Sequence, residues 1–234
     1  IQTAISLHPD RLVTFSYAHL PSLFKRQMIL EKAGLPLQTE KLKMFEEASK
    51  MLQSAGYVPI GMDHFVLPND DLNVALQHHT LHRNFQGYCP RYITAQVYAF
   101  GVSGISQLDA AYAQNIKDIS AYIAQVNAGQ MPIQRGYALA PWQRITREVI
   151  ECIMCNNAIN WHDMAQRLHV SVDEIKQAIH YNEAELKTLQ ADGLIAFDAD
   201  SVEITPEGLP FVRNVAAAFD PMMRHNHRLF SKPV

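Results

Sequence analysis

Cysteine is scarce in this sequence, in which only Cys89, Cys152 and Cys155 occur among 234 residues. An odd and sparse set of cysteines argues against a secreted protein stapled by disulfides and favours a reducing compartment. We therefore expect a cytoplasmic location.

Long apolar runs are also absent, because no stretch of eighteen apolar residues occurs that could span a bilayer. The first residues lack the basic segment followed by an apolar stretch that marks a signal peptide. The sequence therefore predicts no membrane partner. Since the chain begins at Ile1 and not at Met, we expect it to be part of a longer protein.

Excess charge of either sign is lacking as well. The formal net charge is -3 at pH 7, which gives no bulk attraction to nucleic acid. A hydrophobic content of 48% is enough for a core of ordinary size in one large or two small domains. We expect a monomer without a nucleic-acid partner, whose function must be sought in specific sites.

The first third of the chain has the pattern of strand, helix and strand. Residues 11–17 are rich in strand formers, residues 41–55 have apolar side chains at helical spacing, and residues 57–65 have the composition of a second strand. Gly56 ends the helix, and the run from Pro68 to Asp71 ends the second strand. A crossover of this length predicts a parallel βαβ unit.

Residues 93–100 form a third apolar strand candidate, followed by a glycine-rich turn at residues 101–104 and a helical pattern near residues 121–126. We interpret residues 1–136 as one α/β domain that forms part of a sheet or barrel. Barrel enzymes place their chemistry at the carboxyl ends of the strands, where Ala18, His64 and the glycine-rich turn would lie.

Residues 137–234 have a different pattern and are interpreted as a second, mostly helical domain. Pro141 suits the first position of a helix, and Ser171 with Glu174 forms a capping box that opens the second helix of a helix-turn-helix. A helix, a strand, a tight turn and another strand follow, which is a winged-helix pattern. DNA binding is the usual reading of that pattern, but the predicted recognition region carries more acidic than basic residues, so a packing module is favoured.

Two histidine and cysteine motifs have plain structural readings. Cys152 and Cys155 have the spacing of a redox or zinc-binding pair. They lie, however, in a segment with apolar residues at helical spacing, where buried cysteines act as small hydrophobic residues. His78 and His82 would lie on one helix face, but the glutamate of a zincin motif is absent between them, which favours a surface cluster.

Two polar segments have functional readings. Asp63 could fix the tautomer of His64, but neighbouring strand residues point to opposite faces, so we expect no dyad between them. Arg83 and Gln86 could bind a carboxylate or an amino-acid moiety of a ligand. The alternative is a structural role, in which they only hold the loop in place.

Four segments together resemble a known family. They are Phe-Ser-Tyr-Ala-His-Leu-Pro at residues 15–21, Ile-Gly-Met-Asp-His-Phe at 60–65, Leu-His-Arg-Asn-Phe-Gln-Gly-Tyr at 81–88 and Gly-Val-Ser-Gly-Ile-Ser at 101–106. In this order they resemble the oxygen-independent coproporphyrinogen III oxidases, which are radical S-adenosylmethionine (SAM) enzymes. The resemblance implies the later strands of a partial (β/α) barrel followed by a mostly helical, winged-helix-like C-terminal domain.

The resemblance also implies cofactors and site residues. Two SAM molecules are expected, with Ala18 contacting one and Ile105 the other, while Phe85 and Gln86 resemble active-site residues beside them. The 4Fe-4S cluster would be bound by a preceding N-terminal part, because a CxxxCxxC run is absent here and these residues supply no metal ligands.

The implied substrate is coproporphyrinogen III. Two of its propionates would lose hydrogen, carbon dioxide and an electron to become the vinyl groups of protoporphyrinogen IX, in a radical reaction that starts from SAM. The chain departs from the family pattern at Cys89-Pro90, where threonines are usual, at Ala99, near a usual glycine, and at Gly104, a usual alanine. The rival hypothesis is a winged-helix binding module on an inactive α/β scaffold.

Overall fold

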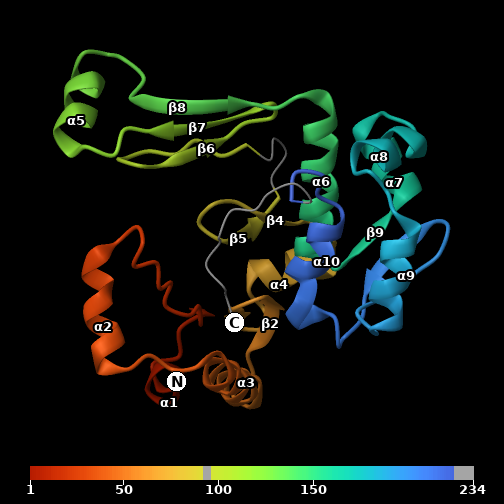
Figure 1. The fold of residues 1–234 in the computed structure, drawn as a ribbon, viewed down its shortest axis with the longest axis horizontal. Helices are drawn as coiled ribbons and strands as arrows, with labels where there is room; N and C mark the ends of the chain where they lie inside the picture. Colours follow the sequence, from red (N-terminus) through yellow and green to blue (C-terminus); the bar gives the residue numbers. More distant parts are fainter. Residues whose placement is uncertain (92–95, 224–234) are drawn as a thin grey trace. The chain divides into compact units, whose positions relative to one another are not determined.

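The computed structural model describes residues 1–91 and 96–223. The chain divides into two compact units, whose described residues are 1–74 in the first and 75–91 with 96–223 in the second. The division falls within helix α4 (Asp71–Gln77), and Figure 1 shows the ribbon of both units. The domain boundary predicted at residue 136 lies inside the second unit and stays a prediction.

The first unit combines a long helix with a small sheet. Its elements are α1 (Gln2–Ser6), β1 (Arg11–Val13), the 3-10 helix η1 (Lys25–Gln27), α2 (Met28–Ala33), α3 (Gln38–Ser54), β2 (Val58–Gly61) and β3 (His64–Val66). As predicted, α3 ends before Gly56, which has a φ of +91° that favours glycine. Leu52, Tyr57 and Phe65 form the buried core of the unit.

The sheet of the first unit corrects the predicted parallel βαβ unit. Its strand order is β1-β3-β2, and β3 pairs antiparallel with both neighbours. The predicted single strand over residues 57–65 is a hairpin, because Met62 adopts a φ of +47° and turns the chain between β2 and β3. The return strand β3 therefore takes the place beside β1 that a parallel neighbour would have occupied.

The second unit begins with a hairpin and a three-stranded meander. The elements are β4 (Leu81–Arg83), β5 (Tyr88–Pro90), β6 (Ile105–Gln107), β7 (Ala111–Asn115), α5 (Ile119–Asn127) and β8 (Ile133–Ala138). The order β6-β7-β8 is antiparallel throughout, and α5 connects β7 to β8 (Figure 1). Of the strand predicted at residues 93–100, residues 93–95 lie outside the described residues, and Val97 forms only an isolated bridge to Gln107.

The remainder of the second unit confirms the winged-helix pattern. Its elements are α6 (Pro141–Asn156), β9 (Ala158–Asn160), α7 (Trp161–Leu168), α8 (Val172–Ala178), α9 (Glu183–Ala191), β10 (Ile195–Phe197), β11 (Ser201–Ile204), η2 (Leu209–Phe211) and α10 (Val212–Ala218). Pro141 is the first residue of α6, and Ser171 caps α8 through the predicted box with Glu174. The three strands form an antiparallel sheet in the order β10-β11-β9.

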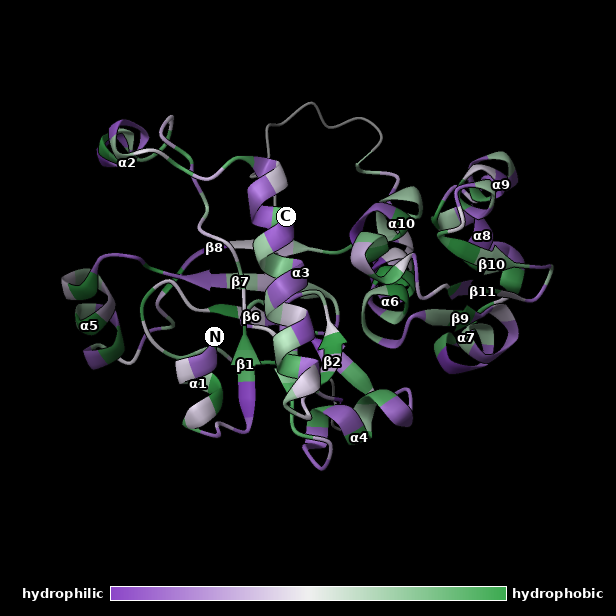
Figure 2. Ribbon diagram, turned by 90° about the horizontal axis from the view of Figure 1, so that it is seen from below, coloured by the Kyte–Doolittle hydropathy of each residue, from purple (hydrophilic) through white to green (hydrophobic). Residues whose placement is uncertain are grey.

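The core of this part lies between α6, α8 and α10. Val149 and Ile153 of α6, Ile175 of α8 and Val215 of α10 are completely buried. Figure 2 shows apolar residues on α6 and α10 where the two helices pack. Burial of its apolar stripe thus fixes the orientation of α6. The polar face of the same helix lines the cavity described below.

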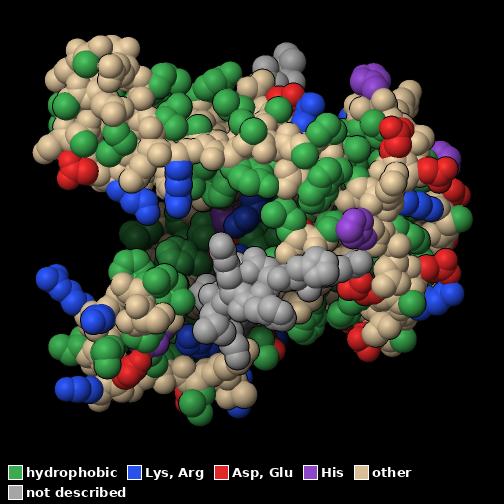
Figure 3. All heavy atoms as spheres, turned by 45° about the horizontal axis from the view of Figure 1, so that its top comes forward, with side chains coloured by type: hydrophobic (Ala, Val, Ile, Leu, Met, Phe, Trp, Pro, Cys, Tyr) green, Lys and Arg blue, Asp and Glu red, His purple; other side chains and the backbone are tan. Residues whose placement is uncertain are grey.

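Apolar side chains also lie at the surface of the second unit. In α5, Ile119, Ile123 and Val126 are 63%, 51% and 47% exposed, and Figure 3 shows hydrophobic side chains over the region of α5 and the meander. None of the helices in the described ranges is long and apolar enough to cross a membrane.

Candidate functional site

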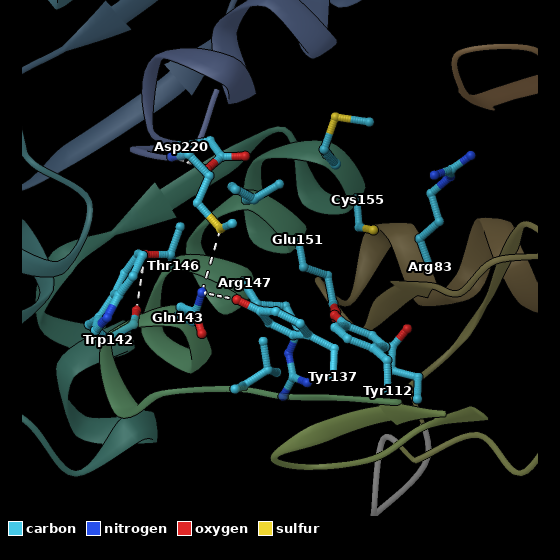
Figure 4. A pocket seen from close by; sticks show the side chains of 15 residues that line it. Arg83, Tyr112, Tyr137, Trp142, Gln143, Thr146, Arg147, Glu151, Cys155 and Asp220 are labelled. Carbon is cyan, nitrogen blue, oxygen red and sulfur yellow. Dashed lines mark hydrogen bonds between the residues drawn. The ribbon is translucent and has the colours of Figure 1, made fainter. Parts of the chain in front are cut away.

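A cavity of about 370 Å³ lies in the second unit, between the meander and helix α6. Figure 4 shows Trp142 and Arg83 at opposite ends of its lining, with tyrosines and Glu151 between them. The remaining lining comes from β6, β7, β8, α6 and the segment that follows α10, and the full set is Arg83, Gln107, Tyr112, Tyr137, Leu139, Trp142, Gln143, Thr146, Arg147, Ile150, Glu151, Met154, Cys155, Asp220 and Met222.

One wall of the cavity is a row of side chains across the meander. Gln107 of β6 pairs with Tyr112 of β7, which pairs with Tyr137 of β8. Residues directly opposite one another in antiparallel strands point to the same face, so the register brings these three side chains together. Burial raises the pKa of the Tyr112 hydroxyl, although Arg147 acts in the opposite direction, so the phenol stays neutral and can donate a hydrogen bond.

The opposite wall is one face of α6, where lining residues recur with helical spacing. Arg147 and Glu151 are four residues apart and therefore neighbours on this face. Nη1 and Nη2 of Arg147 donate to the carbonyls of Leu108 and Asp109 at 3.0 and 2.9 Å. These bonds attach α6 to the turn between β6 and β7.

A buried network of charged residues supports the same helix. His82 Nδ1 lies 2.5 Å from Glu151 Oε1, and both side chains are less than a tenth exposed. The neighbouring Glu148 accepts hydrogen bonds from Arg91 at 2.7 Å and from Arg167 at 3.0 Å. The network connects the β4-β5 hairpin, α6 and α7, and it fixes the orientation of the Glu151 carboxylate at the cavity.

The predicted active-site residues Phe85 and Gln86 lie in the loop between β4 and β5. The Phe85 ring is 60% exposed and meets the ring of Tyr112 edge-on, with 5.6 Å between the centroids. The backbone amide of Gln86 donates to Asn84 Oδ1 at 2.8 Å, and its side chain is exposed. Asn84 thus holds the loop in shape while the Gln86 side chain, which follows Phe85 in the loop, is exposed at the surface.

The two predicted SAM contacts belong to different units. Ile105 opens β6 two residues before Gln107, so both side chains point to the same face of the strand. Ala18 lies in the first unit, where its carbonyl accepts a 3.2 Å hydrogen bond from Gln27. Phe85, Gln86 and Ile105 therefore share one unit and Ala18 belongs to the other, while the predicted roles of all four stay predictions.

Two predictions about histidines are wrong. His64 Nδ1 lies 2.8 Å from Asp63 Oδ1, so the pair that strand alternation excluded does form. Alternation does not apply, because Asp63 lies in the turn and only His64 in the strand. His78 and His82 do not share a helix face, because α4 ends at Gln77 and His82 belongs to β4.

The cysteines do not suit an iron–sulfur cluster. Cys155 is 1% exposed in α6, and burial followed by the charge of Glu151 raises the pKa of its thiol. Burial is confirmed for Cys155, whereas Cys152 is half-buried and its Sγ donates to the carbonyl of Ala158 at 3.1 Å. Within the described ranges, no three histidine, cysteine or acidic side chains are grouped as metal ligands would be. The residues present therefore do not fit a 4Fe-4S cluster, which needs thiolates close together.

Gly104, one of the predicted departures from the family pattern, lies close to Ala99, another of them. A Cβ atom placed on Gly104 would lie 3.1 Å from Cβ of Ala99, closer than nearly all such contacts. The chain thus has room for a methyl group at residue 99 because residue 104 has none. The turn at residues 101–104 is held in place by Asn115, whose Nδ2 donates to the carbonyls of Ala99 and Gly101 at 3.2 and 2.9 Å.

The lining of α6 was not identified from the sequence. The sequence offered one signal for this lining. Charged residues occur at positions 147, 148 and 151, inside a helix that also carries an apolar stripe. A charged side chain beside such a stripe needs a partner, and the partners His82, Arg91 and Arg167 are distant in sequence. Their proximity appears only when the chain is folded.

Comparison with known proteins identifies the family. Residues 139–211 match the model of the HemN C-terminal domain. A relative from Thermostichus vulcanus, named oxygen-independent coproporphyrinogen III oxidase, is 36% identical over 100% of this chain and 71% of its own length. The protein of that name from Escherichia coli K12 is also 36% identical, over 98% of this chain and 49% of its own length. The chain spans about half the length of most of the curated relatives it matches.

A solved structure gives the same answer for the fold. The Escherichia coli coproporphyrinogen III oxidase (HemN), described as a radical SAM enzyme, matches with a TM-score of 0.84 and 35% identity over 94% of this chain and 50% of that one. The match confirms the predicted α/β class with a helical C-terminal part. This chain belongs to the family of oxygen-independent coproporphyrinogen III oxidases.

Proposed function

We propose that this chain forms part of an enzyme that converts coproporphyrinogen III to protoporphyrinogen IX in porphyrin and heme biosynthesis. Each of two propionates would lose one hydrogen atom, one carbon dioxide and one electron and become a vinyl group. When bound, SAM and a 4Fe-4S cluster supply the radical chemistry of such an enzyme, and a one-electron acceptor takes the electron. The cytoplasm is the proposed location.

The observation that carries the proposal is the placement of Phe85 beside the cavity wall, through the ring of Tyr112. An exposed aromatic ring at the mouth of a cavity can cover a bound substrate and exclude water from a reactive centre. The exposed Gln86 amide next to it can donate to or accept from a bound polar group. These residues would thus shield and orient the reacting propionate.

Ile105 supports a SAM contact on the same unit. Its half-buried side chain begins the edge strand of the meander and points to the same face as Gln107 of the cavity wall. An apolar side chain in this position can pack on the adenosyl group of SAM. We assign Ala18 to a second SAM molecule on the resemblance of its segment.

The test is a chimera in which residues 1–234 replace the matching region of the Escherichia coli enzyme. After anaerobic reconstitution with iron and sulfide, the chimera should convert coproporphyrinogen III to protoporphyrinogen IX when SAM and a reductant are supplied. A folded chimera that binds its cluster and cleaves SAM but leaves the propionates intact would overturn the proposal.

Single variants of the chimera test the individual roles. Gln86→Ala should lower turnover roughly ten- to a hundredfold, because a hydrogen bond in a dry site is worth ~1–3 kcal/mol. Ile105→Ala should weaken SAM binding, measured by equilibrium dialysis, by about 2 kcal/mol of lost apolar contact. Cys152→Ala is the control and should leave turnover nearly unchanged, because this thiol donates to the carbonyl of Ala158 and does not line the cavity.

A further inference from the structure

The arginine at one end of the cavity has no anionic partner among the described residues. The Arg83 side chain makes no hydrogen bond or ion pair with any of them, and its buried Nε has no acceptor. Its one recorded contact is with the ring face of Tyr88, 5.7 Å from the centroid. A half-buried guanidinium in this state lacks the carboxylate that would normally satisfy it.

Other arginines of the same unit show the contrast. Arg91 and Arg167 bond to the carboxylate of Glu148 at 2.7 and 3.0 Å, and Arg144 bonds to both oxygens of Asp109. A second arginine of the cavity wall, Arg147, also keeps a buried Nε without an acceptor. Among the described residues, the buried arginine nitrogens without an acceptor are thus the Nε atoms of Arg83 and Arg147, the two arginines that line the cavity.

The other lining residues indicate which chemical groups a ligand would carry besides an anion. Tyr112, Tyr137 and Trp142 offer aromatic surfaces, which suit a flat ring. Glu151 is the acidic group of the α6 wall, and its carboxylate is oriented by His82. A carboxylate repels an anion but accepts hydrogen bonds from N–H groups, such as those of pyrrole rings.

We propose that this cavity is a substrate subsite, which binds one propionate-bearing pyrrole unit of the tetrapyrrole with its carboxylate on Arg83. This assignment rests on the proposed function. The volume of about 370 Å³ is near the lower limit for ligand pockets, so one arm of the macrocycle enters while the rest remains outside. In this arrangement the pyrrole lies among the tyrosines, its N–H faces Glu151, and Phe85 covers the entrance.

The test measures binding of coproporphyrinogen III to the full 234-residue chain by anaerobic equilibrium dialysis. The ligand is then oxidised to the fluorescent porphyrin for quantification. The comparison ligand is the tetraamide, which keeps the macrocycle but has no carboxylate. Arg83→Gln should weaken binding of the tetraacid roughly ten- to a hundredfold, as expected for a charge-assisted pair, and should leave binding of the tetraamide unchanged.

Two further variants make the result specific. Arg83→Lys should recover part of the lost affinity, because it keeps the charge without the bidentate geometry. Arg213→Gln changes an exposed arginine of α10 outside the lining and should alter binding by less than about twofold. Circular dichroism of each variant shows whether it is folded.

Equal binding by Arg83→Gln and the unmutated chain would overturn the subsite, and so would the absence of binding to the unmutated chain. Should Arg83→Gln fail to fold, the unmutated chain decides, because equal affinity for tetraacid and tetraamide contradicts a carboxylate site. Turnover by the unmutated chimera tests the proposed function independently. A working chimera with no Arg83 effect would reject the subsite alone.

Discussion

Replacing Glu148 by Gln removes one charge from the centre of the buried network on α6. The Glu148 side chain is 11% exposed and accepts from Arg91 at 2.7 Å and from Arg167 at 3.0 Å. The glutamine keeps the shape of the side chain but leaves Arg167 without its anion and Arg91 with only Glu151, whose carboxylate oxygen lies 3.5 Å away. The α6 contacts to β5 and α7 should therefore weaken.

Loss of one partner from a buried ion pair destabilises a protein by ~3–5 kcal/mol. Arg91 and Arg167 keep 28% and 39% of their side-chain surface exposed, so water can rehydrate them in part. We therefore expect a loss at the lower end, about 3 kcal/mol in the free energy of unfolding. For a chain of this size that corresponds to a melting temperature roughly 6–12 °C lower. Urea and thermal unfolding at pH 7, followed by circular dichroism, measure both quantities.

The matched control is Glu183→Gln, because Glu183 forms a 2.7 Å ion pair with Lys187 at an exposed site. Such surface pairs contribute ~0–1 kcal/mol, so this variant should unfold almost like the unmutated chain. If both variants lose equal stability, the argument from burial is wrong.

The dependence on pH gives a second check of Glu148. Burial raises the pKa of this carboxyl, whereas the charges of Arg91, Arg167 and Arg147 lower it. The effect of the arginines is larger, so the pKa lies below its ordinary value of 4.5. A group whose folded-state pKa is lowered stabilises the fold above its unfolded pKa and loses this effect as the pH falls through the folded value. The difference between Glu148→Gln and the unmutated chain should be full above pH ~5 and should shrink in more acidic buffers.

Gly104→Ala should lower stability by ~1–3 kcal/mol through crowding against Ala99 and the carbonyl oxygens of Phe100 and Gly101. The double variant with Ala99→Gly should recover part of the loss in a double-mutant cycle, and simple additivity would contradict a direct contact between residues 99 and 104. Gly208→Ala should cost about 3 kcal/mol or more, because its Cβ would lie 1.9 Å from the carbonyl oxygen of Leu194; near-native thermal unfolding would show that the loop adjusts. Cys155, whose pKa is raised by burial and by Glu151, should react with a thiol reagent at pH 8 only when the chain unfolds; rapid modification of the folded chain would refute its burial.

Local sequence signals predicted the winged-helix part well. Pro141 begins α6, and Ser171 with Glu174 caps α8, because both signals act through backbone groups within a few residues. Gly56 ends α3 for the same reason. In each case the interacting atoms are neighbours in sequence, so no tertiary contact was needed to predict them.

The errors came from places where a turn or a distant strand decided the outcome. The turn at Met62 converted one predicted strand into a hairpin and brought Asp63 within hydrogen-bonding distance of His64. The end of α4 at Gln77 separated His78 from His82. Alternation and helical spacing give the direction of a side chain only while the element continues, and its end is the least certain part of a sequence-based prediction.

The sequence by itself determined the family, through four short segments, and the order of local elements in the winged-helix part. It also provided Phe85, whose ring contacts Tyr112 of the cavity wall, and Gln86 in the same loop, while their roles stay predictions. Only the tertiary structure decided that Arg83 and Glu151 line one cavity and that Arg83 has no carboxylate there among the described residues. The physical reason is that a cavity is made by side chains far apart in the chain, and its electrostatic balance depends on which charges are paired in space. Sequence spacing contains no direct record of that pairing.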